Sequence, residues 1–227
     1  MTDDKNTSLI PSGSNGLVRV GNSIEITNKI ISEHEERLLQ GSYPTVKIGN
    51  QQWMSKNLDV DCYANGDLIP QVQNPKEWEN LKTGAWCYYN NDPGNGKIFG
   101  KLYNWYVIKD ERGIAPLGFK CPTLEDWFSL FSFIEQKNQI VKNSLISKTG
   151  WEIENENYNS MNFKAQPSGA RDLNGTYYTL GINAYWWTSS EKNINESYSI
   201  FIGSRIGFPT NFFLDKGNGF SIRLIKE

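Results

Sequence analysis

The last third of the chain is a succession of short strand-like runs. Between residues 161 and 227, runs of apolar or alternating residues are separated by turn residues: NFKAQPSG, TYYTLG, YWWTSS, SYSIFIG, NFFL and FSIRLIK. Short, closely spaced runs bounded by Gly, Asn and Ser predict antiparallel strands. A chain with this ending fits a fold of short strands better than a helical bundle.

Two segments before these strands have helical spacing. In CPTLEDWFSLFSFIEQKN, Thr123 is placed to cap a helix and Asp126 follows three residues later. One face of this helix is expected to carry Trp127, Leu130, Phe131 and Ile134. A shorter amphipathic helix is predicted within IFGKLYNWYVIKDE. TVKIGNQQWMSKNL reads as two strands around a Gly-Asn turn, and NSLISKTGWEIENEN as a loop. Helices embedded among short antiparallel strands predict an α+β domain.

The adjacent pair Trp186 and Trp187 raises a question of packing or binding. Neighbouring side chains on a strand point to opposite faces, so the two rings cannot enter one core together. We predict that Trp186 is a core residue and that Trp187, on the side of Tyr185, is exposed for a ligand. The alternative is that a covering loop buries both rows.

Composition and charge exclude several classes of function. The chain has 227 residues, a net charge of −2 and 13% aromatic residues, so it has no overall positive field for nucleic acid or an anionic membrane. His34 is the single histidine and lies in a charged stretch, which argues against histidine-based zinc sites and Ser-His-Asp triads. The three cysteines give no disulfide framework and are expected to be reduced thiols.

The first 41 residues differ from the rest in composition and residue pattern. Residues 1–16 are polar and predict a flexible tail. Residues 17–41 predict a docking segment, either a helix over about 23–39 or a small hairpin followed by a helix, with Ile24, Ile31 and Leu38 in one stripe. We expect residues 17–40 to bind another protein. The start lacks the pattern of a secretory signal, so a cytoplasmic location, or export by a route without a signal peptide, is expected.

A series of motifs carries a family resemblance. VKIGNQQWMSKNLDV, YANGDLIP, TGAWCYYNNDP, GKLYNWYVI, GIAPLGFKCPTLEDW, YWWTSSE and NGFSIRLIK occur in this order. Together they closely resemble the Fibrobacter succinogenes major paralogous (FISUMP) domain, common in Bacteroidetes and Fibrobacteres, over about residues 45–227. The resemblance implies a C-type-lectin-like fold for a domain spanning 42–227. It also implies that the segments TVKIG and GFSIRLIK, near the domain ends, lie close together.

The resemblance also bears on metal and catalysis. Sugar-binding C-type lectins use calcium through tripeptides that are missing here, and NDPGNG at 91–96 holds one carboxylate, Asp92, so a turn is the better reading. Formylglycine-generating enzymes of similar fold use a C-terminal cysteine pair, but no cysteine follows Cys121. The acidic cluster Glu152, Glu154 and Glu156 favours a solvated loop. We therefore expect no cofactor, no metal, calcium independence and no enzymatic activity.

The remaining candidate is a binding face in the C-terminal region. It mixes rings, an arginine and amides, a composition typical of protein-binding hot spots. The residues proposed to bind a protein or glycan ligand are Tyr185, Trp187, Ser199, Phe201, Arg205, Phe208, Asn211, Phe213 and Asp215. The expected function is a non-enzymatic binding module, tethered through its N-terminal segment. The alternatives are a structural subunit of a larger assembly and a retroelement-diversified variable protein.

Overall fold

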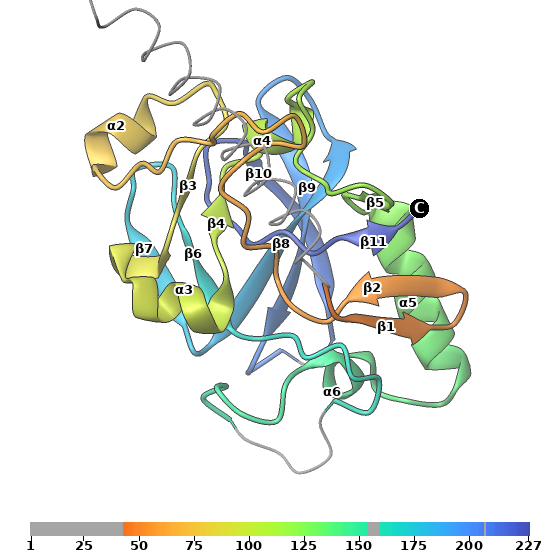
Figure 1. Cartoon of the computed structure of the whole chain (residues 1–227). Coiled ribbons are helices and arrows are strands. Elements are labelled where there is room, and N and C mark those ends of the chain that lie inside the picture. Colours follow the sequence, from red (N-terminus) through yellow and green to blue (C-terminus); the bar gives the residue numbers. More distant parts are fainter. Residues whose placement is uncertain (1–42, 154–158, 207) are drawn as a thin grey trace, which may run out of the picture. The chain divides into compact units, whose positions relative to one another are not determined.

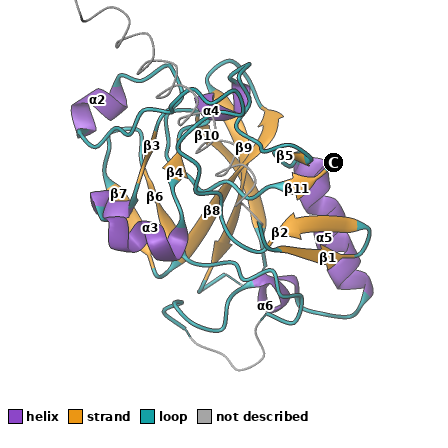
Figure 2. Ribbon diagram, viewed as in Figure 1, coloured by secondary structure: helices purple, strands orange, loops and turns teal. Residues whose placement is uncertain are grey.

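The structure is a computed structural model that describes residues 43–153, 159–206 and 208–227. The predicted tail, the docking segment at 17–41, and Glu154 and Glu156 lie outside the described residues. The described part is mixed α+β, with helices packed around curled sheets (Figure 2). Among its described helices, none is long and apolar enough to cross a membrane.

The first sheet joins segments from both ends of the domain. Its strand order is β1 (Thr45–Ile48), β2 (Gln51–Met54), β11 (Ile225–Lys226) and β5 (Phe119–Lys120). The predicted hairpin TVKIGNQQWM is confirmed, with its turn at Gly49 and Asn50. Ile225 pairs with Trp53 of β2, so the predicted proximity of the opening and closing segments is also confirmed (Figure 1).

The second sheet contains the C-terminal strand runs. Its order is β10 (Thr210–Asp215), β9 (Glu196–Gly203), β8 (Asn183–Glu191), β6 (Ser168–Arg171) and β7 (Tyr177–Leu180). These strands confirm four of the six runs in the C-terminal third, whereas NFKAQPSG is a strand only at its last two residues, where β6 begins. The sixth, FSIRLIK, forms a regular strand only at β11, because residues 219–221 make single bridges to β4, β6 and β8 instead. A small third sheet pairs β3 (Trp86–Cys87) with β4 (Leu102–Tyr103).

The main helix is α5 (Leu124–Gln136), and its predicted start is confirmed. The Thr123 side chain accepts from the Asp126 N–H while the Asp126 carboxylate accepts from the Thr123 N–H, a reciprocal capping box. The other helical elements are short: α2 (Pro75–Glu79), η1 (Tyr89–Asn91), α3 (Pro93–Phe99), α4 (Tyr106–Lys109) and α6 (Val141–Leu145). Helix α4 confirms the predicted short helix. The last three residues of helix α6 fall in the stretch expected to be loop, which is a correction.

Two aromatic cores lie on opposite faces of the second sheet. One contains Trp53, Trp127 and Trp186 together with residues of α5 and α6. The other contains Trp187, Tyr185 and Phe220, and is closed by the long loops between β2 and β5. Covering both faces buries both rows of β8 side chains. This arrangement decides where the candidate binding residues lie.

Candidate binding face

The adjacent tryptophans of β8 are both completely buried, at 0% exposure. The Trp186 ring packs on Trp127, with 5.7 Å between ring centroids, and the Trp187 ring packs on Phe220 at 4.4 Å. The Trp187 indole N–H donates to the Tyr103 carbonyl at 2.9 Å. The two rings do face opposite ways as predicted, but the expectation that Trp187 is exposed is wrong. The alternative, burial of both rows under loops, holds.

Other members of the predicted face are buried with Trp187. Tyr185 is 8% exposed and stacks on Phe220 at 5.1 Å, and Ser199 is 0% exposed. Phe201 is half-buried beside Tyr185, with 5.2 Å between centroids. These side chains occupy the second core, so the expectation that they contact a ligand from an exposed row is wrong. Their physical role is to fill the space beneath the loops.

Four of the predicted residues do reach solvent. Phe208 is 67% exposed and Phe213 is 44% exposed, and the Arg205 and Asn211 side chains are also exposed. Arg205 is held by Glu152, with Nη2 to Oε1 at 2.7 Å and Nε to Oε2 at 3.2 Å. This hydrogen bonding raises the pKa of Arg205. Arg205 is therefore engaged with its own chain.

The strand register separates Phe213 from Phe201. Phe213 lies opposite Tyr198 in the antiparallel pair β9–β10, whereas Phe201 lies opposite Thr210. Cross-strand partners share a face and alternate residues change face, so Phe213 and Phe201 point to opposite sides of the sheet. A single face containing Trp187, Phe201 and Phe213 is therefore excluded. The error arose because the β9–β10 register cannot be read from either strand alone.

A smaller face remains on the outer part of β10. It consists of side chains on one side of β9 and β10 and the lysine above them, and we name it the β10 face: Lys192, Tyr198, Asn211, Phe213 and Asp215. The Tyr198 and Phe213 rings meet edge to face at 6.1 Å, and Lys192 Nζ lies 5.7 Å from the first ring centroid and 5.1 Å from the second. Tyr198 and Lys192 were missed from the sequence. Tyr198 shares a strand face with the core residue Ile200, so its spacing in the sequence gives no sign that its ring borders an exposed face.

A buried lysine fixes the loop next to this face. Lys216 is 3% exposed, and its Nζ donates to the Glu191 carboxylate and, at 2.8 Å each, to the Asn193 and Ile194 carbonyls. The same ammonium lies 4.6 Å from the centroid of the Trp105 ring. The hydrogen bond from Lys216 holds the pKa of Glu191 below its ordinary value. This clamp ties the β8–β9 turn to the residue that follows β10.

Lys216 is one of several internal cations that support the sheet. The buried charged side chains of the described residues are all basic: Lys101, Lys142, Arg171, Lys216 and Arg223. Backbone carbonyls accept most of their hydrogen bonds, as for Arg171, which donates to Val72 at 2.7 Å and to Gln73 at 2.9 Å. Burial lowers the pKa of Arg223 to about 9, which leaves it charged at pH 7. Each of these groups donates at least one hydrogen bond within its own chain.

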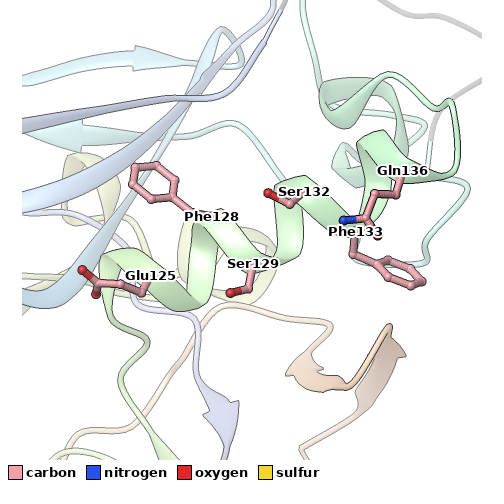
Figure 3. A pocket seen from close by; sticks show the side chains of 6 residues that line it. All are labelled: Glu125, Phe128, Ser129, Ser132, Phe133 and Gln136. Carbon is pink, nitrogen blue, oxygen red and sulfur yellow. The ribbon is translucent and has the colours of Figure 1, made fainter.

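The exposed side of α5 carries a shallow groove of about 470 Å³. Its lining residues are Glu125, Phe128, Ser129, Ser132, Phe133 and Gln136. Figure 3 shows the Phe128 and Phe133 rings projecting in different directions, with the two serines between them along the helix. The Glu125 carboxylate points away from both serine hydroxyls in Figure 3, and a hydroxyl becomes an activated nucleophile only with a base within hydrogen-bond reach. The groove therefore offers contact surface and no evident chemistry.

The turn predicted at 91–96 is a correction, because Asp92 to Gly96 form the N-cap and the first residues of helix α3. Asp92 caps α3, and its Oδ1 accepts from the Gly94 N–H at 2.8 Å. Within the described residues, no group of three or more His, Cys, Asp or Glu side chains is placed to hold a metal ion. The carboxylate singled out for calcium thus has a local structural role.

Comparison with known proteins identifies the family. Searches of curated proteins and of solved structures found no match to the chain. The family model described as the Fibrobacter succinogenes major domain matches residues 46–226, a range that spans all three sheets and α5. The resemblance carried by the seven sequence motifs is therefore correct, and the chain belongs to the Fibrobacter succinogenes major domain family.

Proposed function

We propose that this chain is a non-enzymatic binding module that holds a partner protein through the β10 face. The observation that carries the proposal is the exposed Phe213 ring, at 44%, beside Tyr198 and Asn211 on a sheet anchored by two cores. Aromatic rings flanked by amide and charged groups are typical of the centres of protein interfaces. A rigid sheet also presents them at low entropic cost.

The chemistry of the β10 face favours binding over catalysis. Its carboxylate Asp215 accepts from the Gly217 N–H at 2.8 Å, and Glu196, opposite Asp215 on β9, accepts from the Asn193 side-chain amide at 2.6 Å. The cation Lys192 lies over two rings. General acid–base catalysis needs titratable groups placed within reach of a shared substrate. The neighbouring ion pair of Lys216 and Glu191 is not available as a proton donor or acceptor, because the Lys216 ammonium is occupied by its hydrogen bonds to Glu191 and to the Asn193 carbonyl. The proposed function is accordingly recognition.

The fold and the N-terminal segment complete the proposal. A C-type-lectin-like fold is supported by the sheet that joins the opening hairpin to the closing strand β11 and by the long loops that cover the second core. Residues 17–40 are proposed to tether the module to a second protein. Calcium has no part in the proposal, because Asp92 acts as a helix cap.

Site-specific cross-linking tests the proposed function. A photoreactive phenylalanine analogue is placed at position 213 of the full chain in its native cells, and in a control at position 98. Ile98 lies on α3, outside the β10 face, and is 57% exposed. The proposal predicts a protein adduct from position 213 and none from position 98. No adduct from 213, or equal adducts from both positions, would refute it.

A further inference from the structure

The outer edge of β10 is open for pairing within the part of the chain that is described. In the strand order of the second sheet β10 comes first, and it pairs only with β9. The strand TNFFLD contains no proline and no lysine, the residues that most often block edge strands. An unblocked edge of this kind is a template for a further strand.

The hydrogen-bond phase shows which backbone groups point outward. The Lys216 N–H donates to the Asn195 carbonyl at 2.9 Å, in register with the β9–β10 ladder. In an antiparallel pair, residues alternate between bonding to their partner strand and pointing away from it. Residues 212 and 214 therefore bond to β9, and Asn211 and Phe213 direct their N–H and C=O groups outward. The Asp215 carbonyl is already occupied, because it accepts from the Asn218 N–H at 3.0 Å and from the Asn218 side-chain amide at 2.8 Å. The Ser199 hydroxyl, 3.4 Å from the Phe212 carbonyl, agrees with this phase.

We infer that β10 pairs antiparallel with β10 of a second copy of this chain, centred on Phe213. This inference rests on the proposed binding role of the β10 face and names its partner. A two-fold axis perpendicular to the sheet leaves each side chain on the same face of the sheet in both copies. One residue of β10 must therefore lie directly opposite the same residue of the second copy. Phe213 is a candidate centre because its N–H and C=O both point outward. The Phe213 N–H then bonds to the Phe213 carbonyl of the second copy.

The side chains of β10 complement one another in this register. Phe213 meets Phe213 on the β10 face, and Phe212 meets Leu214 on the opposite face, where both are half-buried. Asn211 lies opposite Asp215, so an amide donor meets a carboxylate acceptor. Asp215 is the only charged residue of the strand, and the register keeps the two copies of it apart. A shift of the centre by one residue loses the Asn211–Asp215 pair.

Sedimentation of the full-length protein at increasing concentration tests the inference. The wild-type chain is expected to form a dimer. Asn211→Asp places like charges opposite each other twice in the dimer, and we expect it to weaken the dimer by about tenfold in Kd. The double variant Asn211→Asp with Asp215→Asn exchanges the two partners and should recover most of the affinity. Asn174→Asp, an equal charge change at the exposed β6–β7 turn, is the matched control and should have no effect.

Each contrary outcome has a defined meaning. A monomer at all concentrations overturns the inference, as does a dimer that Asn211→Asp and the control affect equally. Failure of the double variant to recover affinity overturns the register. An adduct between position 213 and a different protein, with a monomeric chain, overturns the inference and leaves the proposed function standing. Loss of both the dimer and every adduct at position 213 removes the proposed function as well.

Discussion

Trp186 and Trp187 have equivalent structural importance although they belong to different cores. Both are 0% exposed, and each indole N–H has an acceptor, Asn57 Oδ1 at 2.9 Å and the Tyr103 carbonyl at 2.9 Å. Replacing a buried Trp by Ala typically costs about 3–5 kcal/mol. We predict losses of this size for both Trp186→Ala and Trp187→Ala in urea denaturation. A Trp187→Ala variant as stable as the wild type would contradict the described burial.

The Lys216 clamp predicts a pH dependence of stability. The pKa of Glu191 is lowered from 4.5 in the folded state, so its ion pair stabilises the fold above pH 4.5. This stabilisation is lost as the pH falls through the lower, folded pKa. We predict that Glu191→Gln flattens the decline in stability below pH 4.5, measured by denaturation at stepped pH. Glu125→Gln, on the exposed side of α5, is the control; an equal effect from both variants would exclude the clamp as the cause.

The capping box of α5 is the clearest test at the scale of an element. Thr123 caps the first turn through two hydrogen bonds with Asp126. The Asp126 N–H donates to Thr123 Oγ1 at 3.1 Å, and the Thr123 N–H donates to the Asp126 carboxylate. Loss of an N-cap costs about 0.5–2 kcal/mol. Thr123→Ala should lower the free energy of unfolding by this amount, and Thr123→Ser should restore most of it. Equal losses in the two variants would show that the methyl group, and not the hydroxyl, matters.

Elements with strong local signals were predictable from the sequence. The capping residue and apolar stripe define α5, and the Gly-Asn turn defines the β1–β2 hairpin. Helix α6 was missed because its Ile140 cap position has no side-chain capping bond, and its fold depends on burial of Val141 and Leu145. The length of β11 was overestimated because residues 219–224 run between sheets rather than along one. Burial and pairing of this kind depend on tertiary contacts, which local sequence patterns do not reveal.

The binding face was only partly predictable, for a reason at the scale of the whole domain. Alternation correctly separates Trp186 from Trp187, but exposure depends on loops that are distant in the sequence. The Trp187 ring is covered by Phe220 and by Tyr103. The backbones of Phe220 and Tyr103 are hydrogen-bonded to each other. Exposed Phe208, Asn211 and Phe213 were predicted, while Tyr198 was not. Register and loop coverage, which are non-local, account for the difference.

The whole molecule is predicted to fold and bind without calcium. Asp92 is committed to the Gly94 N–H, and no described cluster of ligands is available. A ligand that binds the folded state raises Tm with its concentration. We predict the same Tm for the full chain in EDTA and in millimolar Ca²⁺, measured by scanning calorimetry. A Tm that rises with added Ca²⁺ would contradict this account.

The central claim is that the outer edge of β10 is the edge that binds. Amide hydrogen exchange of the full chain, resolved by residue with NMR, tests it most directly. At low concentration, the Phe212 and Leu214 amides should be protected by β9, while the Asn211 and Phe213 amides exchange rapidly. At high concentration, the Phe213 amide should become protected. A Phe213 amide that is protected at every concentration, or at none, would contradict the account.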